Sequence, residues 1–313
     1  MNIQQLKYVL SVADNKSFGK AAKELFVSQS TLSTMIGKFE DEIGIEIFDR
    51  RFKPIDISKE GIEIIDQIRI VLNELDNLGH VTKVLKGEGG GALKLGIIPT
   101  VAPYLLPIFI NSAAARLPQI QFIVSELTTD EIISSLQSRS LDIGILSLPI
   151  YEDDILETTL YTEPFYLYDG SNKLPKSKVN PAELDYNRLW LMDEGHCMRT
   201  QVITVCDLRN KQEFKRHLEY KSGSIDTLMR FVRQNRGLTL LPHLATHDLN
   251  KEDQAKLRKF VDPSPSRAIG IATHRHFKKS KAKEIIIEEI QKNVKPLLPN
   301  KAAGVIVDPV VVD

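Results

Sequence analysis

Cysteine is scarce in this chain of 313 residues, which contains only Cys197 and Cys206. Two cysteines exclude a scaffold stapled by several disulfides, and they are too few for a four-cysteine metal site. The sequence also lacks a Walker-type phosphate loop, an HExxH helix and a Gly-x-Ser-x-Gly nucleophile turn. The familiar hydrolase and nucleotide-dependent chemistries therefore have no support in the residues.

Long apolar runs and a surplus of one charge are missing as well. No run approaches the roughly 18 apolar residues that span a bilayer, and charged side chains interrupt the first twenty residues, where a signal peptide needs an apolar core. We therefore expect a cytoplasmic protein with no membrane partner. Lys and Arg together number 41, as do Asp and Glu, so the net charge does not indicate an acidic partner such as nucleic acid. Evidence for such a partner must be local.

The composition, with 42% hydrophobic and 26% charged residues, is that of a globular protein, and the length favours two or three compact units. In residues 1–58, apolar residues recur at helical spacing in short stretches separated by polar breaks. Ser17 and Ser28 can cap the second and third stretches, and Gly44 can end the third. Two short helices and a longer one are typical of the helix-turn-helix, and residues 48–57, with basic side chains around a proline, predict a wing hairpin.

A long amphipathic helix is predicted from Ser58 onward, because apolar residues repeat at steps of three and four from Ile65 to Leu85. Such a stripe requires a partner helix, so we expect two chains to pair along it. The glycine-rich stretch 87–91 then predicts a flexible joint.

Strands and helices alternate beyond this joint. The strands are predicted near 93–97, 120–124 and 142–146, and the helices over 104–116 and 129–138. Repeated strand–helix–strand units imply a parallel sheet. A second α/β set is predicted from about 165 to 241, and the strand at 269–272 with the helix at 280–293 indicates a return to the first sheet. The apolar tail at 304–310 can form a strand, but the pattern does not place it.

Together these patterns predict a protein of mixed α+β and α/β class. A winged helix-turn-helix at 1–58 precedes a linker and dimerisation helix with its hinge at 59–91, a two-lobed α/β effector domain at 92–300 and a tail at 301–313. Lobe I is expected at about 92–163 and 267–300, and lobe II at about 164–266. A cleft between the lobes would hold a ligand at the carboxyl ends of the strands.

Short polar side chains cluster at the start of the predicted third helix, at Ser28, Gln29, Ser30, Thr31, Ser33 and Thr34. Such groups can bond phosphates and base edges, and a helix N-terminus favours an anionic backbone. Residues 1–39 hold five lysines, including Lys38, against one Asp and one Glu, a local charge of +3. The alternative is that these residues only cap the helix and face solvent. We favour double-stranded DNA as the partner, with Arg50, Arg51 and Lys53 of the wing on its backbone or minor groove.

Cys197 and Cys206 are the most informative residues outside this head. A disulfide requires Cα atoms within roughly 4.4–6.8 Å, whereas nine residues of helix separate them by about 13.5 Å. The β-branched residues at 202–205 lower helix propensity, so this segment is a candidate for refolding when the bond closes. His196 and Arg199 flank Cys197 and would favour its thiolate. The alternative is a pair of buried, inert thiols, the common state in a cytosolic protein.

The head resembles that of the LysR-type regulators, and the residues that carry this resemblance are Leu6, Phe18, Ala21, Ala22, Ser28, Gln29, Ser30, Thr31, Leu32, Ser33, Ile36, Glu40, Glu42, Gly44, Phe48 and Arg50. Farther along, residues 97–107, 195–199 and 237–242, with a second cysteine nine positions after the first, are similar to the peroxide-sensing branch of that family. Thr200 departs from this branch, in which an acidic residue follows the arginine.

The resemblance implies a periplasmic-binding-protein-like effector domain and a homodimer or homotetramer on two-fold symmetric promoter DNA, with RNA polymerase as a further partner. It also implies that Cys197 and Cys206 form a reversible disulfide when hydrogen peroxide oxidises them. The residues that it assigns to the peroxide pocket are Thr100, Thr129, His196 and Arg199. From their position alone, the two threonines are equally well explained as helix caps.

We therefore predict a transcription regulator of oxidative-stress genes that is switched by oxidation, is not an enzyme and holds neither a metal nor another cofactor. One alternative keeps the DNA-binding head and places an organic small-molecule effector in the inter-lobe cleft. Another is a thiol peroxidase in which the cysteine pair turns over, although the sequence has no CxxC motif and does have a DNA-binding head.

Overall fold

The computed structural model describes residues 1–85, 91–171, 178–208, 222–299 and 304–309. The chain separates into two compact units, one formed by 1–91 with 138–140 and the other by 92–137 with 141–313. The joint predicted at 87–91 lies outside the described residues, except for Gly91. Among the described helices, none combines the length and the apolarity that crossing a bilayer requires.

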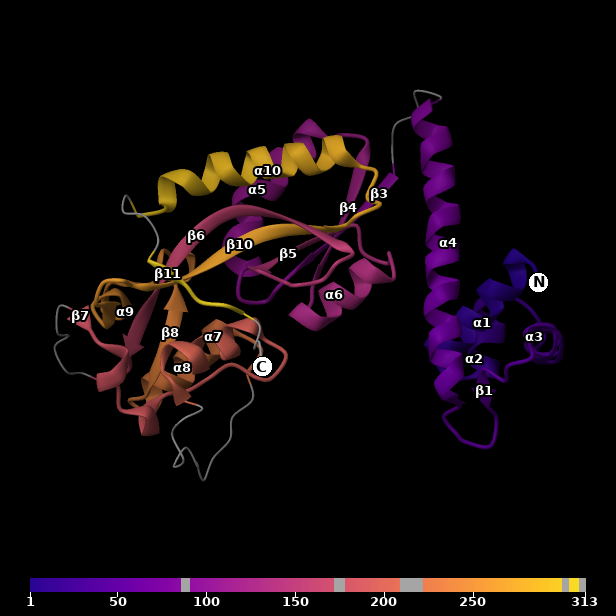
Figure 1. Cartoon of the computed structure of the whole chain (residues 1–313), viewed down its shortest axis with the longest axis horizontal. Coiled ribbons are helices and arrows are strands. Elements are labelled where there is room, and N and C mark those ends of the chain that lie inside the picture. Colours follow the sequence, from indigo (N-terminus) through magenta and orange to yellow (C-terminus); the bar gives the residue numbers. More distant parts are fainter. Residues whose placement is uncertain (86–90, 172–177, 209–221, 300–303, 310–313) are drawn as a thin grey trace. The chain divides into compact units, whose positions relative to one another are not determined.

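The first unit contains the helix-turn-helix that its capping residues predicted. Its helices are α1 (Ile3–Asn15), α2 (Phe18–Glu24) and α3 (Gln29–Ile43) (Figure 1). The hydroxyl of Ser17 accepts a hydrogen bond from the Lys20 amide, and that of Ser28 from the Thr31 amide, so both serines cap their helices. Gly44 ends α3 at a φ of 70°, in the left-handed region that glycine tolerates.

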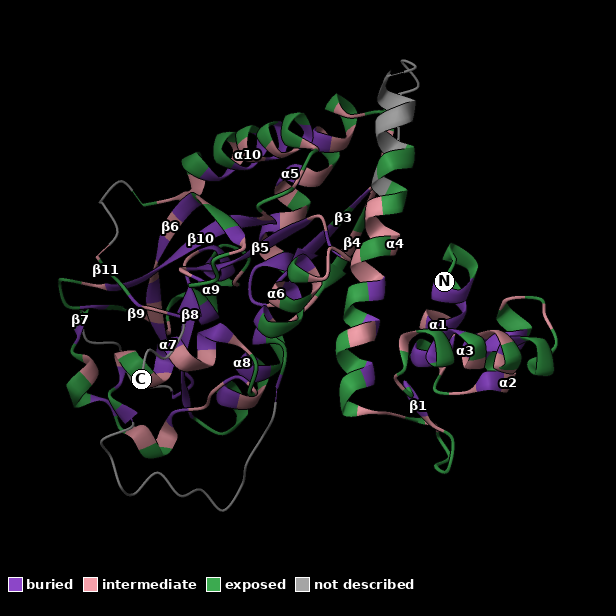
Figure 2. Cartoon of the chain, turned by 45° about the vertical axis from the view of Figure 1, so that its right-hand side comes forward, coloured by how far each residue is buried: buried purple, intermediate pink, exposed green. Residues whose placement is uncertain are grey.

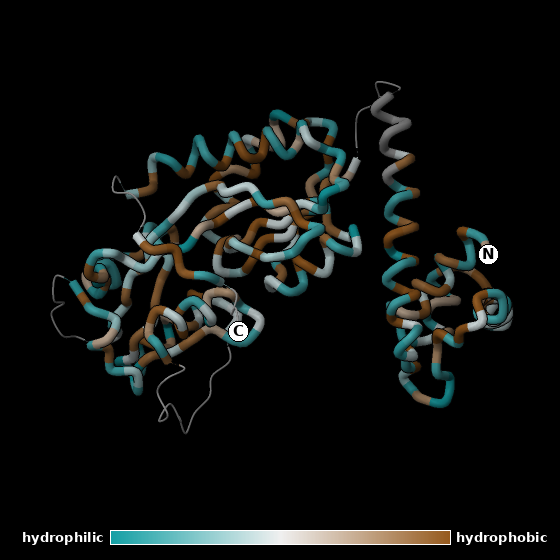
Figure 3. The backbone as a smooth tube through the Cα atoms, in the orientation of Figure 1, coloured by the Kyte–Doolittle hydropathy of each residue, from teal (hydrophilic) through white to brown (hydrophobic). Residues whose placement is uncertain are grey.

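The wing and the long helix complete this unit. β1 (Phe48–Asp49) and β2 (Asp56–Ile57) form a short antiparallel hairpin, and α4 (Lys59–Leu85) follows it. Ile65 and Ile68 of α4 are buried in the apolar core of the head. Farther along, Val71, Leu75 and Leu78 are 44%, 38% and 60% exposed. Figure 3 shows hydrophobic and hydrophilic segments alternating along α4, so its apolar stripe continues beyond the head.

The second unit is built on a long mixed sheet. Its strands are β3 (Gly91–Ile97), β4 (Ile120–Glu126), β5 (Ile143–Leu148), β6 (Ile155–Asp169), β7 (Lys178–Val179), β8 (Leu238–Pro242), β9 (Leu257–Phe260), β10 (Pro265–His274) and β11 (Val305–Ile306). They lie in the order β4-β3-β5-β10-β6-β9-β7, with β11 beside β10 and β8 beside β6. β3 and β5 are parallel, as predicted, whereas β10 is antiparallel to β5 and β6. The sheet is mixed because β6 carries the chain out of lobe I and β10 returns it.

Helices cover both faces of this sheet, and their bounds are α5 (Ala102–Arg116), α6 (Thr129–Gln137), α7 (Cys197–Val205), α8 (Ile225–Gln234), α9 (Lys251–Gln254) and α10 (Ser280–Val294). Figure 1 shows α5 and α10 together on one face and α6 on the other. One buried core forms around β3, β5 and α5 and a second around β8, α7 and α8 (Figure 2). β6 passes from the first core to the second. The predicted two-lobed α/β architecture is confirmed.

The apolar tail, which the sequence pattern did not place, lies beside β10. β11 pairs with Pro265 and Ser266 in parallel, and the Val307 amide donates to the Ser266 carbonyl at 2.8 Å. The hydroxyl of Tyr151 donates to the Asp308 carboxylate at 2.6 Å. Residues 304–309 are thereby held against the second unit.

Candidate functional site

The two cysteines lie at the two ends of one helix. α7 begins at Cys197 and ends one residue before Cys206, and both thiols are buried and not joined by a disulfide. Gly195 turns the chain toward α7 at a φ of 81°, and His196 is the N-cap residue. Because the helix between the cysteines is intact, they are separated by about 13.5 Å along its axis. The disulfide therefore cannot form unless α7 opens, as the sequence predicted.

The surroundings of Cys197 shift the pKa of its thiol in opposite directions. Burial raises the pKa of the thiol, while the Arg267 guanidinium, the Thr129 hydroxyl and the main chain at Met198 and Ser147 lower it. Its position in the first turn of α7 adds the positive end of a helix dipole. The net result is a pKa above the ordinary value, so the protonated thiol predominates near neutral pH.

Arg267 is a buried cation that sequence analysis missed. Its side chain is 1% exposed and forms an ion pair at 2.9 Å with Glu163, whose side chain is fully buried. The guanidinium also donates to the Thr100 hydroxyl at 3.1 Å and to the Thr100 carbonyl at 3.2 Å. Arg267 on β10 stands directly opposite Glu163 on β6, so the register of the sheet creates the pair. The sequence around Glu163 and around Arg267 does not indicate that either side chain is buried.

The threonines of the predicted pocket have different partners. Thr128, not Thr129, caps α6: its hydroxyl accepts a hydrogen bond from the Glu131 amide at 3.4 Å, while its own amide and hydroxyl donate to the Glu131 carboxylate at 2.8 and 2.9 Å. The Thr129 hydroxyl is buried beside the Cys197 thiol and has no oxygen or nitrogen partner among the described residues. The Thr100 hydroxyl accepts its hydrogen bond from Arg267. Helix capping therefore explains neither of the two predicted threonines.

A cavity of about 410 Å³ opens beside Cys197. Of the predicted pocket residues, Thr129, His196 and Arg199 line it together with Cys197, whereas Thr100 does not. The structure thus brings three of the four residues together around the thiol. Thr100 is connected to the thiol through Arg267 instead.

His196 and Arg199 act on Cys197 less directly than the sequence suggested. Burial lowers the pKa of His196, although nearby carboxylates oppose this effect, so its imidazole is neutral at pH 7. A neutral imidazole can carry a proton but adds no positive charge beside the thiol. Arg199 donates to the Met192 carbonyl at 3.0 Å and lies 4.0 Å from the Glu194 carboxylate. The cation that lowers the thiol pKa most is Arg267.

Gln201 connects α7 to its surroundings, and sequence analysis did not select it. Its fully buried side chain donates to the Ser147 hydroxyl at 3.1 Å and to the Val307 carbonyl at 2.8 Å. The side-chain amide oxygen of Gln201 has no partner among the described residues. Because Gln201 lies between the cysteines, opening α7 would disturb its bond to the segment 304–309. Gln201 could have been selected from the sequence because it is a polar residue on the apolar face of α7.

In the first unit, α3 presents a polar face to solvent, formed by Gln29, Ser30, Thr31, Thr34 and Lys38. Two other predicted residues have structural roles. Ser28 caps α3, and the half-buried Ser33 accepts a hydrogen bond from Arg50 at 3.2 Å. The Ser30 and Thr31 hydroxyls are also hydrogen-bonded to the Ser28 hydroxyl, at 2.9 and 2.7 Å. The exposed residues form a row of polar groups along this helix that a ligand can reach.

The two wing arginines, Arg50 and Arg51, are exposed but also form hydrogen bonds with carboxylates of the protein. Arg50 donates to the carboxylate of Glu40, a residue only 8% exposed, at 2.8 Å. Arg51 donates to Asp49 at 2.9 Å, and these hydrogen bonds lower the pKa of the Asp49 carboxyl to about 2. Lys53 is exposed and has no ion pair among the described residues. Lys38 and Lys53 are therefore the predicted lysines most available to an anionic partner. Within the described part of the chain, no group of His, Cys, Asp and Glu is arranged to hold a metal ion.

Two family models match the chain over its two units. The LysR substrate binding domain matches residues 86–295, and the bacterial regulatory helix-turn-helix protein of the lysR family matches residues 3–61. The chain belongs to the LysR family. The first LysR match includes β3 to α10 with α7, and the second includes α1, α2, α3 and the wing.

Curated relatives of this LysR-family chain include regulators with different names. The DNA-binding transcriptional dual regulator OxyR of Escherichia coli K12 is 32% identical over 273 residues, which cover 87% of this chain and 88% of that protein. The hydrogen peroxide-inducible genes activator of Haemophilus influenzae is 30% identical, with 87% and 90% covered. The HTH-type transcriptional regulator EstR of Acinetobacter baylyi is 31% identical, with 88% and 91% covered.

Solved structures similar to this LysR-family chain carry the OxyR name. A full-length OxyR variant from Pseudomonas aeruginosa has a TM-score of 0.72 and 30% identity, covering 93% of this chain and 98% of that one. OxyR from Porphyromonas gingivalis has a TM-score of 0.63 and 28% identity, covering 69% and 99%. The resemblance to the peroxide-sensing branch that the sequence suggested is confirmed.

Proposed function

We propose that this LysR-family protein is a DNA-binding transcription regulator that senses hydrogen peroxide through Cys197 and Cys206 and controls oxidative-stress genes. One observation carries the proposal: the Cys197 thiol borders a cavity, the Thr129 hydroxyl beside it has no oxygen or nitrogen partner among the described residues, and the Arg267 cation lowers the pKa of the thiol. An inert buried cysteine needs only apolar neighbours. A hydroxyl directed at the thiol and a nearby cation suit a thiolate and a small polar oxidant instead.

The first chemical step forms a sulfenic acid. The Cys197 thiolate attacks one oxygen of hydrogen peroxide, an S–O bond forms, and the O–O bond breaks. The departing hydroxide takes up the proton that the thiol released, carried by His196 in the cavity lining, and leaves as water. Thr129 donates a hydrogen bond to the peroxide, and Arg267 stabilises the thiolate.

The second step closes the disulfide and changes the fold locally. The Cys206 thiol releases its proton and the thiolate attacks the Cys197 sulfur, so that an S–S bond forms as the S–O bond breaks. The departing hydroxide takes up that proton and leaves as a second water. This reaction requires α7 to open, which removes the Gln201 bonds to Ser147 and Val307. Oxidation is thereby converted into a rearrangement of the second unit, the kind of two-state change that can alter DNA binding.

The same proposal includes the assembly and the partners. The exposed apolar stripe of α4 pairs two chains, and the paired α3 helices read a two-fold symmetric promoter site in double-stranded DNA. The dimers associate as a tetramer, and RNA polymerase is the further partner. The division into a DNA-binding domain at 1–58, a linker at 59–91 and a regulatory domain at 92–300 belongs to this proposal.

Mass spectrometry of the two cysteines, combined with DNA footprinting before and after a short peroxide exposure, tests the proposal. The wild-type chain should form the Cys197–Cys206 disulfide and shift its footprint. Cys197→Ser should do neither, whereas Cys206→Ser should form a sulfenic acid and over-oxidise more readily for lack of a resolving thiol. A footprint that still shifts in Cys197→Ser would contradict the cysteine switch. Continuous peroxide turnover with a reductant would indicate an enzyme instead.

An organic effector is the second candidate, and the size of the cavity favours it. The cavity volume of about 410 Å³ is within the range of small-molecule sites. A relative of similar identity, EstR, is also not named for peroxide. A footprint that responds to a small organic molecule and not to peroxide would establish this alternative.

A further inference from the structure

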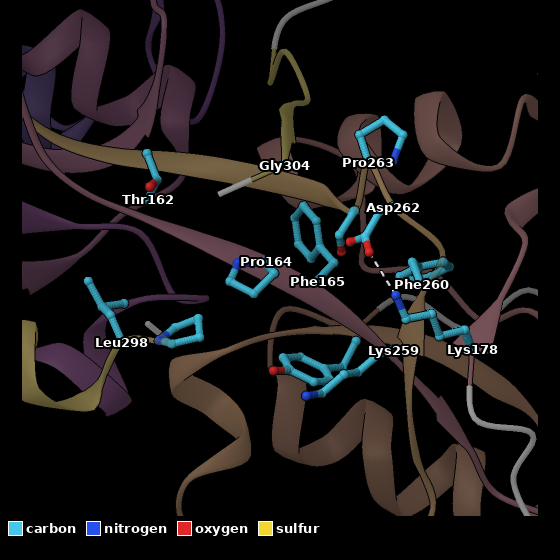
Figure 4. A pocket seen from close by; sticks show the side chains of 13 residues that line it. Thr162, Pro164, Phe165, Lys178, Lys259, Phe260, Asp262, Pro263, Leu298 and Gly304 are labelled. Atoms are coloured by element: carbon cyan, nitrogen blue, oxygen red, sulfur yellow. Dashed lines mark hydrogen bonds and ion pairs between the residues drawn. The ribbon is translucent and has the colours of Figure 1, made fainter. Parts of the chain in front are cut away.

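A second pocket, of about 540 Å³, lies among β6, β7, β9 and the turn that leads into β10 (Figure 4). Its volume is within the range of small-molecule sites. Thr162, Pro164, Phe165 and Tyr166 line it from β6. Successive residues of a strand point to opposite faces, so Thr162, Pro164 and Tyr166 share one face, and Phe165 lies on the face of Glu163, with its ring 5.9 Å from the Arg267 guanidinium. The pocket shares no lining residue with the cavity beside Cys197, so the two are separate.

One side of this pocket is a row of cationic and hydroxyl groups. Tyr166 on β6 stands opposite Lys259 on β9, and Lys259 stands opposite Lys178 on β7. The Lys178 ammonium is neutralised by Asp262 at 2.7 Å, as the dashed line in Figure 4 shows. The main chain of Lys259 takes part in this strand pairing, but neither its ammonium nor the Tyr166 hydroxyl has a hydrogen bond or ion pair among the described residues. The row thus offers one uncompensated positive charge beside a free phenol.

The other side of the pocket is apolar. Pro164 and Leu298 lie on this side in Figure 4, with Pro299, while Phe165, Phe260 and Pro263 add apolar surface nearer to Asp262. Such a wall can bury the hydrocarbon part of a ligand, at about 25 cal/mol per Å² of apolar surface removed from water. Asp262 is the acidic residue of the lining, and Lys178 already neutralises it. The site therefore disfavours cations.

We propose that this pocket binds a small organic anion, a carboxylate or a phosphate monoester with an apolar body. The anionic group binds the Lys259 ammonium and the Tyr166 hydroxyl, and the body packs against Pro164, Pro263 and Leu298. Charge-assisted hydrogen bonds fix the orientation, and apolar contact supplies the remaining affinity. The inference goes beyond the proposed function, since peroxide chemistry at Cys197 requires no ligand here.

The position of the pocket on β6 makes its ligand a regulator of the redox centre. Thr162 and Pro164 lie on either side of Glu163, which holds the Arg267 guanidinium at 3.0 and 2.9 Å. Arg267 in turn lowers the pKa of the Cys197 thiol. A ligand packed against Thr162 and Pro164 restrains the strand that positions Glu163, and therefore changes the reactivity of the thiol through Arg267.

Binding is tested on the reduced full-length protein by titration calorimetry and ligand-observed NMR, with benzoate, hexanoate and phenyl phosphate as probes and benzamide as the neutral analogue. At least one anion should bind saturably, and benzamide should bind about tenfold more weakly because it cannot form the charged hydrogen bond. Lys259→Glu should lose the anion by a similar factor. Lys281→Gln, an exposed lysine outside the lining, is the matched control.

Three results overturn the binding site: no saturable binding of any anion, equal binding of benzamide, or unchanged affinity in Lys259→Glu with an unchanged melting temperature. For the coupling, the saturating anion should change the rate of Cys197 oxidation by about fivefold in the wild type and not in Lys259→Glu. An unchanged rate would contradict the coupling. Cys197→Ser must still bind the anion, so failure of peroxide sensing and failure of this site are distinguished.

Discussion

At the scale of single residues, the redox centre depends on the balance between burial and one cation. Cys197 is 6% exposed, and the loss of water around its sulfur favours the neutral thiol. Arg267 opposes this effect from inside the same core, where Glu163 neutralises its charge. A sensor thiol that is mainly protonated at rest reacts only through its minor thiolate fraction. Its reaction rate is therefore sensitive to both pH and the Arg267 charge.

The rate of Cys197 oxidation by peroxide is expected to rise with pH. Because the pKa of the thiol lies above its ordinary value, the thiolate fraction should increase about tenfold per pH unit between pH 6 and 8. The measurement is the rate of sulfenic acid trapping in Cys206→Ser, with Cys197→Ser as the background control. A rate that stays constant over this range would show that the thiol pKa is lowered instead.

Replacement of Arg267 separates stability from reactivity. Arg267→Met leaves Glu163 buried and unpaired, which should cost about 3–5 kcal/mol of unfolding free energy. The double variant Arg267→Met/Glu163→Gln removes both charges and should recover most of that loss. Peroxide oxidation of Cys197 should be slower in the double variant than in the wild type, because the cation that lowers the thiol pKa is absent. Wild-type oxidation kinetics in the folded double variant would exclude a role for Arg267.

At the scale of elements, the proposed function predicts contacts of two kinds between α3 and DNA. Lys38→Ala should weaken binding about equally on all duplexes and reduce the salt slope by about one, since we expect this lysine to contact a phosphate. Gln29→Ala should instead change the preference between related sequences. Electrophoretic mobility across a salt series measures both effects, and Lys94→Ala on the exposed side of β3 is the control. Binding that does not respond to salt would argue against this interface.

α7 has a low intrinsic helix propensity and is stabilised by packing, so it is a helix that can unfold locally. Val202, Ile203, Thr204 and Val205 are β-branched and favour helix weakly, yet Val202 is buried and the Cys206 amide bonds to its carbonyl at 3.0 Å. Packing therefore holds a helix that its own sequence supports poorly. In the proposed switch, formation of a Cys197–Cys206 disulfide would have to overcome only that packing and the hydrogen bonds of Gln201.

At the scale of the whole molecule, the exposed stripe of α4 calls for a second chain. Val71, Leu75 and Leu78 recur at helical spacing and are exposed in the single chain. Leu75→Glu/Leu78→Glu should shift the protein to monomers and weaken binding to two-fold symmetric DNA, because the paired heads separate. Light scattering at micromolar concentration measures the mass, with Asp66→Asn, an exposed residue on the face of α4 away from this stripe, as control. A wild-type monomer at that concentration would contradict pairing along α4.

Features that depend on neighbouring residues could be read from the sequence alone. Ser17, Ser28 and Gly44 were predicted as helix limits because capping acts within three or four residues of its partner. The alternation of strands and helices, the wing and the long α4 follow from the same local periodicities. Which predicted residues contact DNA or peroxide stays a prediction.

The tertiary structure decided everything that depends on residues far apart in the chain. The Glu163–Arg267 pair exists because antiparallel β6 and β10 meet in one register, and a shift of one residue would point the two side chains to opposite faces. The bond from Gln201 to Val307 depends on β11 lying beside β10. The row of Tyr166, Lys259 and Lys178 arises from three strands in register. Local sequence determines which elements form, because capping and periodicity act over one or two turns, whereas strand pairing determines which side chains meet.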